Sequence, residues 1–215
     1  MRHALIPPNL IVKKTLTMPL FNKLFFTCAL LISKQVLAED LPKNISSQMP
    51  VGYEVMSYLS GELNDDKLLD YLVVAHKKNE QATFDKTREG SPRPLFIFIQ
   101  NKNATFSLAK RNDTVVMAID EGGQCDPFED GEEGLVIKNH FFTVQNSVAC
   151  GQHWNDFTTF RYDAKLKNWL FHQRSAQSWQ LNDSNKPNAE ALISDGVTTT
   201  KANPKKPVLF DQYKR

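Results

Sequence analysis

GELNDDKLLDYLVV, residues 61–74, joins an acidic, amide-rich loop directly to an apolar run. Residues 68–75 are mostly aliphatic and almost continuously apolar, which predicts a strand buried inside a sheet. Residues 51–59, just before the loop, fit either a strand or a short helix. The stretch therefore indicates a β-sheet domain in which a polar loop leads directly into a buried strand.

Apolar runs and turn signals continue this pattern along the chain. Residues 95–100 are predicted as a second central strand, and residues 105–111 and 114–119 continue a meander. Two hairpins follow, one turning at Asn139-His140 and the other at residues 163–168. Residues 76–94 and 182–207 lack a regular apolar period and are predicted as exposed connections before a closing strand at residues 208–213.

The predicted fold class is mainly β, an antiparallel meander that forms a sandwich or a propeller-like sheet. The turn signals separate about eight to ten short strands, at the spacing that such folds require. Little helix is expected outside the N-terminal segment. The sequence holds no internal repeat with a period of about 20–50 residues, which argues against a multi-bladed propeller.

The first 38 residues have the profile of a signal peptide. They carry five basic residues, no acidic residue and a short apolar run at residues 24–32, followed by Val36-Leu37-Ala38. We expect a signal peptide at residues 1–38, with Met18 as an alternative start, and cleavage before Glu39. The rival interpretation, a lipoprotein processed at Cys28, is disfavoured because no small residue precedes that cysteine.

The rest of the chain is then a flexible lead-in at residues 39–50 and a single β domain at residues 51–215. These features predict a periplasmic or secreted protein with no stable membrane span after cleavage.

The net charge changes sign when the N-terminal segment is removed. The 26 Lys and Arg residues fall to 21 against 24 Asp and Glu, which leaves a net charge of about −3. No dense Lys/Arg stripe with interleaved aromatic residues remains. Nucleic acid is therefore not among the predicted partners.

Two cysteines remain after residue 38, Cys125 and Cys150. An even pair in an exported chain predicts a disulfide bond. Closing a loop of this length stabilises the fold by roughly 3–4 kcal/mol in the chain-entropy model. A redox pair would need a C-x-x-C motif, and a nucleophile beside His153 would need the free thiolate that the disulfide consumes.

The opening loop has part of the spacing of a calcium-binding loop. Its candidate ligands occupy the first, third, fifth and ninth places of that loop: Glu62, Asn64, Asp66 and Asp70. Lys67 stands at the sixth place, where glycine normally allows a sharp turn, and Val73 stands where a bidentate carboxylate belongs. These departures favour a structural loop built from Asx turns over a calcium site. Calcium is the one cofactor for which the sequence offers candidates.

At these residues the chain resembles the G-D-L-N-x-D-x-x-x-D-hydrophobic motif of FG-GAP/VCBS-type β repeats. It also looks like a family of uncharacterised exported bacterial proteins with one such motif, followed by segments matched here by RPLFIFI (residues 93–99), Arg111-Asn112-Asp113 and Asp126-Pro127-Phe128. The resemblance spans residues 50–175. It implies a mainly β exported domain and no assigned activity.

Three further groups of residues have both a functional and a structural interpretation. The carboxylates of a second acidic loop would suit glycoside hydrolysis, although acids this close together usually form a solvated face. The histidines have no metal-ligand spacing. The tryptophans, with one tyrosine, would suit a sugar-binding face, although aromatic residues in hairpins usually pack across strands. The groups are Glu129, Asp130, Glu132 and Glu133; His76, His140, His153 and His172; and Trp154, Trp169, Trp179 and Tyr162.

Together these patterns predict an exported, non-enzymatic, disulfide-containing β domain that binds a protein or another ligand of the cell envelope. Acidic loops favour a partner with a basic surface. The alternatives are a carboxylate-dependent, glycosidase-like hydrolase and a carbohydrate-binding module.

Overall fold

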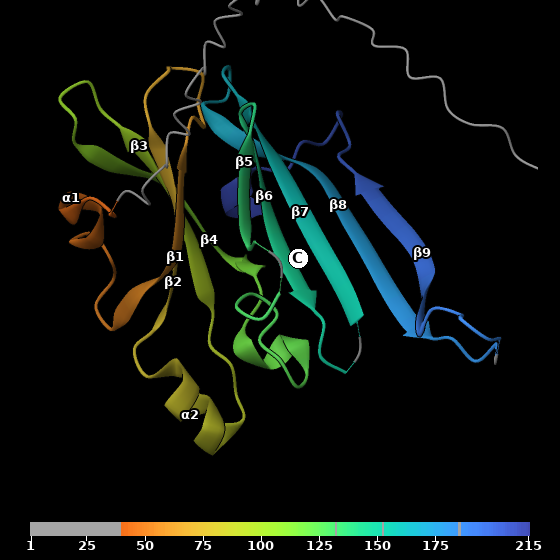
Figure 1. The fold of residues 1–215 in the computed structure, drawn as a ribbon. Coiled ribbons are helices and arrows are strands. Elements are labelled where there is room, and N and C mark those ends of the chain that lie inside the picture. Colours follow the sequence, from red (N-terminus) through yellow and green to blue (C-terminus); the bar gives the residue numbers. More distant parts are fainter. Residues whose placement is uncertain (1–39, 132, 152, 185) are drawn as a thin grey trace, which may run out of the picture. The chain divides into compact units, whose positions relative to one another are not determined.

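The computed structural model of the protein describes residues 40–215 apart from residues 132, 152 and 185 (Figure 1). Its strands form two antiparallel sheets, in which each strand pairs with the next along the chain. The four-stranded sheet contains β1 (Tyr53–Gly61), β2 (Asp70–Lys77), β3 (Arg93–Gln100) and β4 (Phe106–Val116). The five-stranded sheet contains β5 (Leu135–Lys138), β6 (Phe141–Val148), β7 (His153–Asp163), β8 (Asn168–Leu181) and β9 (Leu192–Lys201).

Helix is a minor component of the described residues. It comprises α1 (Lys43–Ser46), α2 (Glu80–Thr87) and the 3-10 helices η1 (Ile119–Gly122) and η2 (Phe210–Gln212). None of the described helices is long and apolar enough to cross a membrane. The mainly β prediction is confirmed, and two packed open sheets correspond to its sandwich alternative rather than to the propeller-like one.

The main core joins the two sheets. Leu72 of β2 and Ile97 of β3 pack in one cluster with Phe142 of β6 and Phe160 of β7. The rings of Phe142 and Phe160 stack with their centroids 5.1 Å apart, and Phe210 of η2 meets Phe160 edge-on at 5.2 Å. Such ring pairs add to the free energy gained by removing apolar surface from water.

A second cluster on the other face of the four-stranded sheet explains the composition of β2. Leu72 and Val74 belong to the main core, whereas Tyr71, Val73 and Ala75 pack in the second cluster. Successive side chains of a strand point to opposite faces, so both faces of β2 are buried. This is why the predicted strand lacks a polar face, and the prediction of a buried strand is confirmed.

The segment predicted as a flexible lead-in contributes to this second cluster. Residues 39–50 include α1, whose Ile45 is fully buried against the sheet. A helix of four residues carries almost no amphipathic signal, so the sequence alone did not indicate this contact. The predicted signal peptide, residues 1–38, lies outside the described residues.

Arg93, the first residue of β3, is a buried cation with only 1% of its surface exposed. Its guanidinium donates hydrogen bonds to Glu80 of α2 at 3.0 and 2.7 Å and to both carboxylate oxygens of Asp126, one at 2.7 Å. Burial alone would raise the pKa of Asp126, but hydrogen bonds from Arg93 and from backbone N–H groups hold that pKa below its ordinary value. Arg93 therefore joins α2, the sheet and the loop after η1.

The disulfide between Cys125 and Cys150 confirms the predicted pairing and lies next to Asp126. It joins the acidic loop to the chain just beyond β6, with the two Cα atoms 6.2 Å apart. The loop is thus held by a covalent bond and by a buried ion pair at adjacent residues.

Three segments differ from the sequence prediction. Residues 76–94 are not one exposed connection, because they contain α2 and end in the buried Arg93. Residues 182–207 contain β9, an edge strand whose side chains are almost all exposed and which therefore lacks an apolar period. The closing strand predicted at residues 208–213 is replaced by η2, with one isolated bridge between Leu209 and Leu170.

Gly61, the last residue of β1, allows the two sheets to approach closely. A Cβ atom at this position would lie 2.8 Å from Ile137 Cγ2 and 3.2 Å from Ile137 Cβ in β5. Those distances are shorter than a van der Waals contact, so only glycine fits here without displacing β5.

We predict that Gly61→Ala lowers the free energy of unfolding by about 1–3 kcal/mol, because the added methyl group overpacks the contact with Ile137. Denaturant unfolding of Gly61→Ala, Ile137→Ala and the double variant measures this energy as a double-mutant cycle. The alanine at residue 61 should cost less when Ile137 is truncated. An equal cost in both backgrounds would contradict the close contact.

Candidate functional site

The acidic loop between β1 and β2 is built from its own side chains. The backbone N–H of Asp66 donates to Asn64 Oδ1 at 3.2 Å, and that of Leu68 donates to Asp66 Oδ1 at 2.8 Å. The Asn64 amide also donates to Asp66 Oδ2 at 3.0 Å. These are the Asx turns that favoured a structural loop, and they hold the left-handed backbone of Asp65 and Lys67.

Asp70 fastens the end of this loop to the sheet. Its side chain is fully buried and accepts hydrogen bonds from the backbone N–H groups of Leu63 at 3.1 Å and Gln100 at 3.0 Å. The carbonyl oxygen of Leu63 in turn accepts a hydrogen bond from Trp169 Nε1 at 2.9 Å, which ties the loop to the five-stranded sheet. Both carboxylate oxygens of Asp70 therefore accept hydrogen bonds that hold the loop against the sheet.

Burial raises the pKa of Asp70 to about 6 from its ordinary value of 3.8. The two backbone hydrogen bonds oppose this rise, and the neighbouring carboxylates of Asp66 and Glu62 add to it. Calcium binding by Glu62, Asn64, Asp66 and Asp70 stays a prediction.

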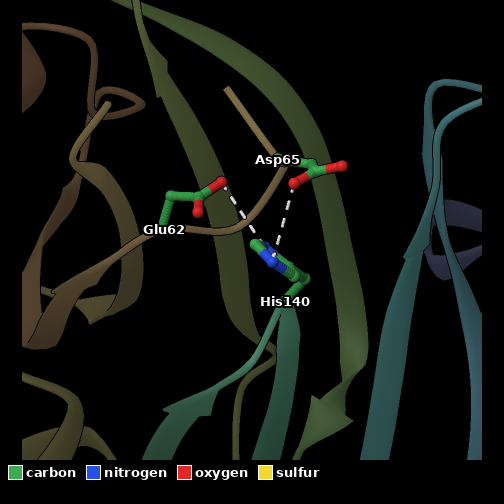
Figure 2. Close-up of side chains that lie close together, drawn as sticks. All are labelled: Glu62, Asp65 and His140. Atoms are coloured by element: carbon green, nitrogen blue, oxygen red, sulfur yellow. Dashed lines mark ion pairs between the residues drawn. The ribbon is translucent and has the colours of Figure 1, made fainter. Parts of the chain in front are cut away.

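Glu62, Asp65 and His140 form a different cluster, shown in Figure 2. His140 Nδ1 lies 3.4 Å from Glu62 Oε1, and His140 Nε2 lies 3.7 Å from Asp65 Oδ1. Glu62 and Asp65 belong to the β1–β2 loop, and His140 belongs to the turn between β5 and β6. Of the four predicted calcium ligands, only Glu62 joins this cluster.

The turn that carries His140 is the hairpin turn predicted from Asn139-His140. Both residues adopt positive φ angles, 52° and 62°, as a two-residue type I′ turn requires. His140 reaches the β1–β2 loop because β5 packs closely against Gly61. The sequence offered no metal-ligand spacing for this histidine, because its carboxylate neighbours lie more than 70 residues earlier, and only the packing of the two sheets brings them together.

The carboxylates of the loop affect Tyr162, which packs against Trp169. Burial raises the pKa of the Tyr162 phenol above its ordinary value, and the negative charges of Asp66 and Asp163 raise it further. Asp66 in the loop thus lies close enough to Tyr162 to disfavour the ionised phenol.

Two carboxylates of the second acidic loop make contacts that stabilise the fold. Asp126 is the buried partner of Arg93, and Asp130 accepts a hydrogen bond from the backbone N–H of Asp126 at 2.9 Å. Glu129 and Glu133 are exposed, and Glu132 lies outside the described residues. Hydrolysis by these carboxylates stays a prediction.

The aromatic residues proposed for a sugar-binding face are separated by the fold. Trp169 is buried in the core and Tyr162 packs on it. Trp154 and Trp179 are half-buried at the far end of the five-stranded sheet and line a cavity of about 470 Å³. Trp154 pairs with Ser178, and Trp179 pairs with His153, so the two tryptophans lie on neighbouring strands, apart from Trp169 and Tyr162. Two of the histidines lie apart from both groups. His76 lies beside Glu54 and Glu80, and His172 packs against the Phe141 ring.

Searches against protein-family models, curated proteins and solved structures found no match to this chain.

We predict that Asp70 makes the stability of the protein depend on pH. Because its pKa is higher in the folded state, the stability that it contributes is fully present below about pH 4 and is lost as the pH rises through about 6. The loss amounts to about 3 kcal/mol. Urea unfolding of the wild type and of the uncharged isostere Asp70→Asn should show this change in the difference between their free energies of unfolding. A difference that stays constant from acid to neutral pH would contradict the prediction.

Proposed function

We propose that this protein is an exported, non-enzymatic binding domain. It binds a protein partner at the edge of its five-stranded sheet that β8 and β9 form. Two observations support export. The first 38 residues have the charge and hydropathy pattern of a signal peptide, and the only two cysteines after them form a disulfide.

The binding surface is the β8–β9 ribbon, residues 173–181 of β8 paired with residues 192–201 of β9. Only the beginning of β8 belongs to the main core, where Trp169 and Phe171 pack. Beyond that point the ribbon exposes apolar side chains: Leu181 at 79%, Val197 at 60% and Ile193 at 39%. Leu181 pairs with Leu192 and Ile193 pairs with Gln180, so the ribbon carries exposed apolar side chains on both of its faces.

The observation that carries the proposal is the free edge of β9. β9 is the last strand of its sheet and pairs with β8 alone among the described strands, although it is ten residues long. An edge strand of this length presents unpaired backbone N–H and C=O groups, which an extended segment of another protein can bind by adding a strand.

The register of β9 supports a narrower position for the proposed partner strand. Pairing with β8 is regular from Val197 to Lys201 and shifts between Gln177 and Trp179, next to Gly196, whose φ angle is 96°. Such a bulge twists the strand and interrupts further pairing. The added strand is therefore expected along residues 197–201.

The cavities at the base of the ribbon suggest the chemistry of that partner. The cavity beside Trp179 includes Glu190, and a second cavity of about 430 Å³ beside Trp154 includes Asp195, whereas Glu121 in that second cavity is already paired with Arg215. Carboxylates next to an indole face attract Lys and Arg side chains by charge and by cation–π contact. A basic extended segment fits both features.

Site-specific photo-crosslinking in the native cell envelope tests this function. A photo-reactive residue at Val197 should give a discrete crosslinked product, whereas one at Leu166, similarly exposed at 53% in the β7–β8 turn, should not. Adding Glu190→Lys should reduce the yield severalfold, because it reverses a charge at the cavity, whereas Glu89→Lys on the α2–β3 connection should not. Equal products from residues 197 and 166, or none from either, would contradict the proposal.

A further inference from the structure

The cluster of Glu62, Asp65 and His140 combines one imidazole nitrogen with two carboxylate oxygens. One ligand atom from each residue lies within 4.8 Å of the other two. Imidazole together with carboxylate is a ligand set that suits zinc and related divalent transition metals, whereas calcium takes oxygen ligands alone. The donor types therefore differ from those of the calcium-like spacing in the same loop.

Two atoms of the cluster are buried without a hydrogen-bond partner among the described residues. They are Glu62 Oε1 and His140 Nδ1, which lie 3.4 Å apart, at ion-pair distance, on side chains that are 30% and 39% exposed. A buried polar atom without a hydrogen-bond partner carries an uncompensated desolvation cost. A cation bound between them would remove that cost for both atoms at once.

The separation of these atoms matches one edge of a tetrahedral metal site. Two ligands held at about 2.0–2.1 Å from a zinc ion in tetrahedral geometry lie about 3.3–3.4 Å apart. Glu62 Oε1 and His140 Nδ1 already have this spacing. Asp65 Oδ1 lies 3.7 Å from the other ring nitrogen, Nε2, so the Asp65 side chain, which is 75% exposed, would have to rotate toward Nδ1 to bind the same ion. Water would complete the fourth position.

We propose that Glu62, Asp65 and His140 bind a divalent transition-metal ion of the zinc class. The ion would join the β1–β2 loop to the β5–β6 turn and so cross-link the two sheets. His140 lies just before β6 and Cys150 just after it, so the metal and the disulfide would fasten the two ends of the same strand. The site is independent of the β8–β9 ribbon.

Calorimetric titration of the full, disulfide-intact protein with Zn²⁺ tests the site, together with the shift that Zn²⁺ causes in the melting temperature. We expect one equivalent to bind and the melting temperature to rise. His140→Asn removes the imidazole but keeps a residue that tolerates the left-handed turn, as Asp65→Asn does in the loop. Each should weaken binding by roughly tenfold or more and reduce the thermal shift accordingly.

The matched control is His153→Asn, which removes the histidine that begins β7 and should bind Zn²⁺ like the wild type. Far-UV circular dichroism confirms that each variant is folded. The proposal is overturned if millimolar Zn²⁺ produces neither heat nor thermal shift, or if His140→Asn binds as tightly as the wild type. Calcium that binds at the same site and displaces zinc would overturn the assignment to transition metals.

Discussion

The buried guanidinium of Arg93, held between Glu80 and Asp126, is the interaction on which the arrangement of this domain depends. It connects a helix, the start of β3 and the acidic loop, and the disulfide of Cys125 begins one residue away from Asp126. A buried charge is tolerated only when its partners satisfy it, so the three side chains act as a unit. Removing the cation alone would leave two carboxylates in a site from which water is largely excluded.

The domain is therefore fastened differently at the two ends of β6. At one end, Arg93 and the disulfide fix the acidic loop. At the other, Asp70 and the glycine contact at Gly61 bring the β1–β2 loop onto the β5–β6 turn, where Glu62, Asp65 and His140 meet. The proposed metal site thus rests on elements whose positions the core dictates, whereas the proposed partner surface lies on the ribbon that leaves the core.

Local sequence patterns correctly predicted the structural features that depend on residues close together in the chain. The doubly buried β2, the Asn139-His140 turn and the Asx turns of the acidic loop all follow from composition and spacing. Features that depend on distant contacts were missed. Arg93 was predicted to lie in an exposed connection because its carboxylate partners are 13 and 33 residues away, and His140 had no nearby ligand in the sequence. Strand β9 was missed because an exposed edge strand has no apolar face to repeat.

The central claim, that the Arg93 ion cluster organises the fold, is tested most directly by the free energy of unfolding in urea at neutral pH. Arg93→Met should cost about 3–5 kcal/mol, because it leaves Glu80 and Asp126 buried without their counter-ion. The triple variant Arg93→Met, Glu80→Gln and Asp126→Asn keeps the shapes and removes the charges, and should recover a large part of that loss. An Arg93→Met protein as stable as the wild type, or a triple variant no more stable than the single one, would contradict this account.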